Sequence, residues 1–142
     1  MTDPADPHGL QRFLTAQAPV MERVRAELRA GRKTSHWMWF VFPQIAGLGR
    51  SETARFYAIR SRDEAVAYLA HPVLGARLLD CARLVNAVEN VSVEGIFGSV
   101  DAAKFRSCVT LFGAVSPERA EFAMALRKFF GGLADEATLG LL

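Results

Sequence analysis

Residues 33–49, KTSHWMWFVFPQIAGLG, concentrate side chains that could bind a small molecule or act on it. His36 could serve as a general base or a hydrogen-bond donor, and Trp37 and Trp39 each offer an aromatic face and an indole N–H. Gln44 adds a carboxamide that both donates and accepts hydrogen bonds. Because a dry core must satisfy every polar edge, these residue types favour the wall of a ligand site.

A second polar group lies in residues 101–110, DAAKFRSCVT. Asp101, Lys104, Ser107 and Thr110 follow at three-residue steps, and side chains three positions apart are neighbours on a helix. The spacing predicts one polar line that presents a helix start and an ammonium to an anion such as phosphate. The simpler alternative is a capped helix start with a surface ion pair.

The aromatic stretch also has a purely structural interpretation. Phe40, Val41 and Phe42 have no polar edge, and we expect them to anchor the segment in the core. Pro43 favours an irregular conformation, since the residue before proline avoids the helical region. The alternative to a ligand site is therefore a structural aromatic core with no site.

Length and composition place the chain among globular proteins. Its 142 residues are 51% hydrophobic and 23% charged, which predicts one domain spanning residues 1–142. Cys81 and Cys108 match no metal or redox spacing and are expected to be reduced core residues, and no pair of histidines has metal-ligand spacing. No apolar run reaches membrane-spanning length and Met1–His8 is no secretory signal, so a cytoplasmic location is expected.

Positive charge is unevenly distributed along the chain. Residues 1–62 carry a net charge of +5 and residues 63–142 carry −3, within a total of +2. Five cations precede the aromatic stretch: Arg23, Arg25, Arg29, Arg32 and Lys33. They form either a solvated helix face or an electropositive rim that attracts an anionic ligand.

Caps and helical periodicity predict an all-α fold, a single compact multi-helix domain with a long aromatic connection over about residues 33–50. We expect a helix after Asp6-Pro7, broken at Pro19 and ending at Gly31. Further helices are expected to start at Ser51, Ser61, Pro72, Ser99 or Asp101, Ser116-Pro117 and Asp135, with a stop at Gly131-Gly132.

GRKTSHWMWFVFPQIAGLG and DAAKFRSCVTLF resemble the two signature segments of an uncharacterised bacterial family that is often labelled calpastatin. The resemblance runs from about Leu10 to Phe130 and implies a small, helical, stand-alone cytoplasmic domain without an established activity. Cys108 departs from the pattern, where a small residue is expected. The positions that match are His36, Trp37, Trp39, Phe42, Pro43, Gln44, Tyr57, Asp101, Lys104, Ser107, Thr110 and Phe112. The label itself does not fit, because inhibitors of that kind are disordered chains.

These observations lead to one leading hypothesis and two alternatives. The leading one is a pocket for a nucleotide-like or other anionic small molecule, contacted by Trp37, Trp39, Gln44, Lys104, Ser107 and Thr110. His36 and Asp101 are the candidate catalytic pair if the ligand is turned over, and no metal or cofactor is expected. The alternatives are a nucleic-acid or protein binding module that uses the basic N-terminal part, and the structural aromatic core.

Overall fold

Helices provide the regular structure of residues 3–142, the part of the chain that the computed structural model describes, and no strand forms there. The predicted all-α fold is confirmed. The helices are α1 (Gln11–Gln17), α2 (Met21–Ala30), α3 (Met38–Val41), α4 (Glu52–Phe56), α5 (Arg62–Ala70), α6 (Leu74–Ala87), α7 (Val93–Phe97), α8 (Ser99–Val115), α9 (Ala120–Phe130) and α10 (Glu136–Gly140).

Most helix ends lie where the caps predict them. The side chains of Ser51, Ser61 and Asp135 each accept the backbone N–H three residues further on, which satisfies one orphan donor of the helix that follows. α2 and α9 stop at Gly31 and Gly131, whose φ angles of 71° and 61° lie in the left-handed region that glycine adopts without strain.

Three predicted starts were too early. α6 begins at Leu74 and not at Pro72. Asp6 does cap α1, but its carboxylate accepts the N–H groups of Leu10 and Gln11, so the helix begins at Gln11 and not at Pro7. α9 begins at Ala120 and not at Pro117, because the Ser116 side chain donates to Glu118 and makes no cap hydrogen bond to the helix.

Two short helices were not predicted. α3 is a single helical turn within the aromatic stretch. Because its four residues are all apolar, the sequence shows no alternation of polar and apolar positions that would indicate a helix. α7 begins after Ser92, whose side chain accepts the N–H of Gly95. Helices of four or five residues have too few apolar positions to show a helical period in the sequence.

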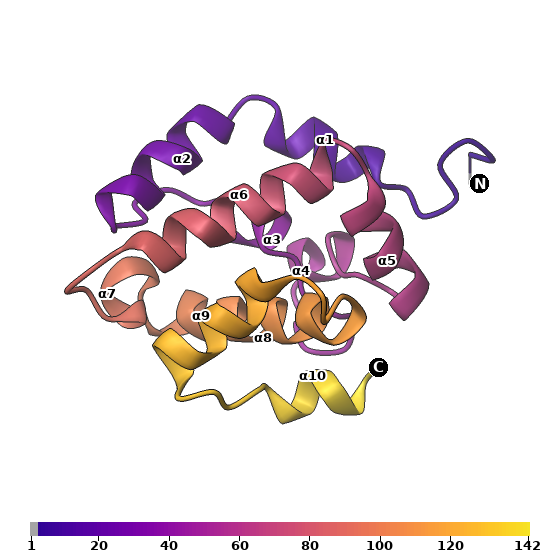
Figure 1. Ribbon diagram of the computed structural model, residues 1–142. Helices are drawn as coiled ribbons and strands as arrows, with labels where there is room; N and C mark the ends of the chain where they lie inside the picture. The colour runs from indigo at the N-terminus through magenta and orange to yellow at the C-terminus, as the bar shows by residue number, and fades with distance from the viewer. Residues whose placement is uncertain (1–2) are drawn as a thin grey trace.

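The core lies between two packed groups of helices (Figure 1). α6 packs against α2, α5 and α9, while α8 packs against α5, α7, α9 and α10. Phe105 on α8 lies 5.0 Å, ring centroid to centroid, from both Phe42 and Phe97. Val41 and Phe42 are buried as expected, and Phe40 is half-buried. Cys81 and Cys108 are free and buried, and burial raises the pKa of Cys81 to about 12.

Candidate functional site

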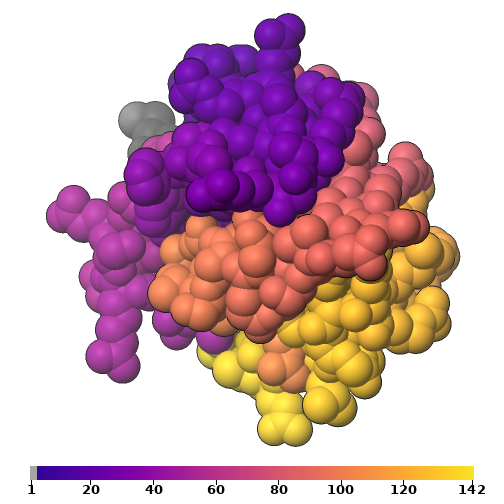
Figure 2. All heavy atoms as spheres, turned by 90° about the vertical axis from the view of Figure 1, so that its left-hand side faces the viewer, coloured from indigo at the N-terminus to yellow at the C-terminus, as the bar shows by residue number. Residues whose placement is uncertain are grey.

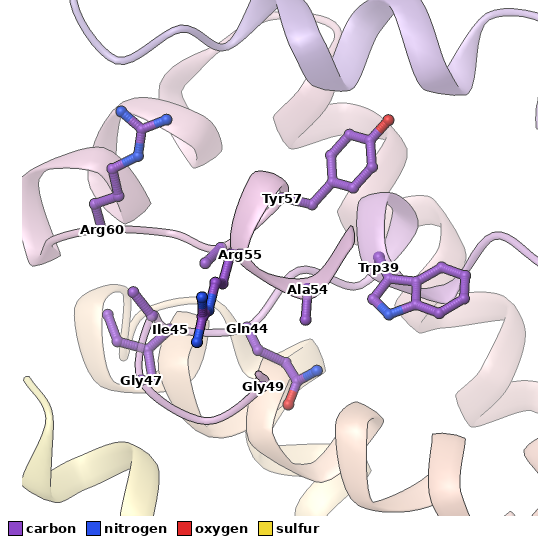
Figure 3. A pocket seen from close by; sticks show the side chains of 11 residues that line it. Trp39, Gln44, Ile45, Gly47, Gly49, Ala54, Arg55, Tyr57 and Arg60 are labelled. Carbon is purple, nitrogen blue, oxygen red and sulfur yellow. The ribbon is translucent and has the colours of Figure 1, made fainter. Parts of the chain in front are cut away.

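A cavity of about 260 Å³ opens between the loop that follows the aromatic stretch and the segment containing α4. One wall is the loop of residues 44–49 and the other is the chain from Ala54 to Arg60. We refer to it as the 44–60 cavity (Figure 3). Its lining comprises Trp39, Gln44, Ile45, Ala46, Gly47, Gly49, Ala54, Arg55, Tyr57, Ala58 and Arg60.

Backbone pairing holds the two walls together at their base. An isolated parallel bridge joins Ile45 to Ile59, both buried. The Ile59 N–H donates to the Gln44 carbonyl and the Ala46 N–H donates to the Ile59 carbonyl, each at 2.8 Å. This pairing therefore fixes the spacing of the two walls at one point.

Close contacts at Gly47 and Gly49 hold the 44–49 loop in position. A Cβ added to Gly49 would lie 2.5 Å from the Ala54 Cβ, so only glycine lets the loop approach α4 this closely. Gly47 has a φ of 106°, and the Leu141 methyl carbons would lie 3.3 Å from a Cβ added there. The loop is thus held between α4 and the residue that follows α10.

Arg12 holds the wall formed by residues 54–60 from the side opposite the cavity. Its guanidinium donates to the carbonyls of Phe56 at 2.8 Å and Ala58 at 2.9 Å, and to the Glu64 carboxylate at 2.6 Å. Glu64 also accepts the backbone N–H of Arg60. The side chains of Arg12 and Glu64 are only 7% and 2% exposed, so the wall is attached to a buried ion pair.

The polar side chains of the cavity, by contrast, have no partner. In residues 3–142 no hydrogen bond or ion pair engages the side chains of Trp39, Gln44, Arg55, Tyr57 or Arg60. Figure 3 shows the Arg55 guanidinium and the Gln44 carboxamide extending to the same side, next to the loop, with the indole nitrogen of Trp39 turned toward them. The Arg60 guanidinium and the Tyr57 hydroxyl extend away from that space.

Behind Trp39 lies a network of charges. The Lys104 ammonium is 4.7 Å from the centroid of the Trp39 ring and 3.3 Å from Asp101 Oδ1. Asp101 Oδ2 pairs with Lys33 at 2.9 Å, and Lys33 in turn lies 5.1 Å from the Trp37 ring. Lys104 therefore supports Trp39 from outside the 44–60 cavity and does not line it.

Trp37 belongs to a different arrangement, which we call the Glu27 latch. Trp37 is 1% exposed, and its indole N–H donates to the Glu27 carboxylate at 3.1 Å. That carboxylate also accepts the Thr34 N–H and both the N–H and the hydroxyl of Ser35. Burial raises the pKa of Glu27, but the hydrogen bonds from Ser35, Thr34 and Trp37 outweigh it and lower the pKa to about 2.

The predicted polar line on α8 does not exist. A helix turns by about 100° per residue, so Thr110 lies roughly opposite Asp101 and three-residue steps do not follow one face. Ser107 and Thr110 are buried, 7% and 3% exposed, and both bind Asp135 ahead of α10. They attach α10 to α8, and neither lines the 44–60 cavity.

His36 and Asp101 are not joined by a hydrogen bond or ion pair in the described part of the chain. His36 is exposed and does not line the cavity, while both oxygens of Asp101 face ammonium groups. Arg32 and Lys33 do not line the cavity either. The cations that do, Arg55 and Arg60, were not singled out by sequence motifs.

The local amino-acid composition did indicate a cluster of positive charge that includes Arg55 and Arg60. Residues 50–62 contain four arginines and one glutamate, a net charge of +3 that exceeds the +2 of the whole chain. No cluster of potential metal ligands occurs within residues 3–142. None of the helices in the described range is long and apolar enough to cross a membrane.

Comparisons with known proteins agree with this architecture. The family model described as "Protein of unknown function (DUF1810)" matches residues 7–142. The solved structure of the conserved hypothetical protein Rv1873 from Mycobacterium tuberculosis is 51% identical, with a TM-score of 0.95 over 96% of this chain and 98% of that chain. No curated protein matches the chain.

Proposed function

The chain belongs to the DUF1810 family, whose description names no activity, and we propose that it binds a small anionic molecule in the 44–60 cavity. One observation carries the proposal: the polar side chains lining this cavity have no partner in the described residues, whereas Arg12 and Glu64, which hold the Ala54–Arg60 wall, are paired with each other. Arg12 and Glu64 also each bind backbone groups of that wall.

The unpartnered groups favour an anion. The indole of Trp39 and the guanidinium of Arg55 can only donate, and no aspartate or glutamate lines the cavity. A guanidinium presents its N–H groups as a planar fork that matches two oxygens of a carboxylate or phosphate. Arg55 and Trp39, with Gln44 beside them, are the proposed contacts of the anionic group.

The lining favours binding over catalysis. It contains no serine, threonine, cysteine, histidine or carboxylate, so it offers none of the usual nucleophiles and only Tyr57 as a titratable hydroxyl. His36 and Asp101, the catalytic candidates from sequence, lie outside it. We therefore assign the protein a ligand-binding role and leave Trp37, Ser107 and Thr110 out of the proposed site.

A melting experiment tests the proposal. Pyrophosphate and citrate, titrated at constant ionic strength, should stabilise the native protein by about 1.4 kcal/mol at ten times Kd, which raises Tm by about 3–6 °C. Arg55→Ala should abolish the rise for the ligand that binds. Arg29→Ala, which removes an exposed charge on α2, should retain it. If neither anion raises Tm, or if the rise survives in Arg55→Ala, the proposal is wrong.

A further inference from the structure

Resting on the proposed anion site, we infer that its ligand is a nucleotide, with the phosphate in the 44–60 cavity and the base stacked on Phe56. Phe56 is the last residue of α4 and directly follows Arg55. Such a ligand carries a base joined through a sugar to a phosphate, as found in a free mononucleotide or in the terminal nucleotide of a single strand.

The first observation is the exposure of Phe56. The other phenylalanines, tryptophans and tyrosines of the described chain are buried or half-buried, whereas Phe56 is 55% exposed. Its ring lies 4.8 Å from the Tyr57 ring at 86°. Tyr57 lines the cavity and is itself held by Phe13 and Phe40. Phe56 thus packs against a residue that lines the cavity, while more than half of its own surface remains open to solvent.

The second observation is the size of the cavity. At about 260 Å³ it is smaller than the roughly 300–1,000 Å³ of typical pockets for drug-sized ligands. It fits a phosphate and part of a sugar better than a whole nucleotide. The remainder of a larger ligand would lie outside it, and Phe56, next to Arg55 in the chain and in contact with Tyr57, offers an exposed aromatic ring.

The third observation is charge. Residues 50–62 carry a net charge of +3, and Arg50, Arg55 and Arg60 lie within six positions of Phe56 in the sequence. The segment around residue 50 projects beyond the helical body, at the left edge of Figure 2. An exposed aromatic among arginines fits a base next to phosphates better than an apolar protein partner, which would need a contiguous apolar patch.

Direct titrations can separate the base from the phosphate. Adenosine monophosphate should bind about 5–150-fold more tightly than ribose 5-phosphate, because one stacked base contributes that much. Phe56→Ser should remove this advantage and leave the affinity for ribose 5-phosphate unchanged. Val100→Ser is the matched control, since Val100 is 70% exposed and does not line the cavity; it should change neither affinity.

Failure of the nucleotide inference and failure of the proposed anion site give different results. If ribose 5-phosphate binds through Arg55 but adenosine monophosphate binds no more tightly, the anion site stands and the nucleotide inference is wrong. The inference is also wrong if Phe56→Ser leaves the advantage of the base intact. A 5′-phosphorylated tetranucleotide identifies the source: binding as tight as the mononucleotide indicates a strand end, and exclusion indicates a free nucleotide.

Discussion

The Glu27 latch and the 44–60 cavity each contain one of the two tryptophans of the aromatic stretch, yet their polar groups have opposite surroundings. In the latch, one buried carboxylate accepts four hydrogen bonds and the Trp37 indole is sealed in the core. In the cavity, the donors of Trp39 and Arg55 have no partner within residues 3–142.

The same contrast holds for the two tryptophans, which are only two positions apart in the sequence. Trp37 and Trp39 flank Met38 at the start of α3, so their side chains leave the helix in different directions. One indole N–H finds Glu27 inside the protein, and the other faces the cavity. A polar edge in a sequence motif therefore indicates that a partner is needed, and only the fold decides whether the protein or a ligand supplies it.

The largest expected effect comes from breaking the ion pair behind the cavity. Arg12→Ala leaves the Glu64 carboxylate buried without its cation and frees the carbonyls of Phe56 and Ala58. We expect a loss of about 3–5 kcal/mol in the free energy of unfolding, measured by urea denaturation. A loss below about 1 kcal/mol would show that the pair does not hold the wall.

The second largest effect is expected from acid, which protonates Glu27 and so weakens the Glu27 latch. The pKa of Glu27 is about 2 when folded and about 4.5 when unfolded, so its stabilisation is full above pH 4.5. It is lost as the pH falls from about 4.5 to 2, and amounts to about 2 kcal/mol after allowance for solvent screening. Urea titrations of the wild type and Glu27→Gln check this, because the variant should lack that part of the acid dependence. Parallel curves would contradict the assignment.

Gly49→Ala should act on the cavity with a smaller cost in stability. The added methyl group would collide with the Ala54 side chain, and the exposed loop can move aside, so we expect a loss of about 1 kcal/mol. The displaced loop should weaken ligand binding more than it weakens the fold. Pyrophosphate affinity and urea denaturation, measured on the same preparation, check both effects. Unchanged affinity would mean that the loop does not shape the site.

The smallest expected effect belongs to His36. Its side chain is exposed and does not line the cavity, so His36→Ala should change the free energy of unfolding by less than about 0.5 kcal/mol. Affinity for pyrophosphate should stay within twofold of the wild type. A large loss of affinity would return His36 to the site and show that the cavity description is incomplete.

The sequence predicted the fold well because caps are local signals. Ser51, Ser61 and Asp135 act on the backbone three residues away, so their roles follow from the order of residues. Glu27 and Arg12 were missed because a single charged residue on an amphipathic helix is typical of a solvated face. Only the folded chain brings Arg12 next to Glu64, 52 positions away.

The site was predicted in part for the same reason. Trp39 and Gln44, which line the cavity, lie on either side of the end of α3, and Pro43 indicated in the sequence that regular structure stops there. Arg55 and Arg60 form no motif, and their local charge was the only sign of them. The proposed line from Asp101 to Thr110 failed because three-residue steps drift around a helix.

Calorimetric titration of pyrophosphate into the wild type, Arg55→Ala and Arg55→Lys tests the central claim most directly. The claim is that unpartnered donors in the 44–60 cavity exist to bind an anion. We predict that Arg55→Ala weakens binding about 10–150-fold, as expected for a lost hydrogen bond to a charged group. Lysine should restore part of the affinity by keeping the charge without the planar fork. The free energy of unfolding should stay within about 0.5 kcal/mol of the wild type. Equal affinity in all three proteins would contradict the account.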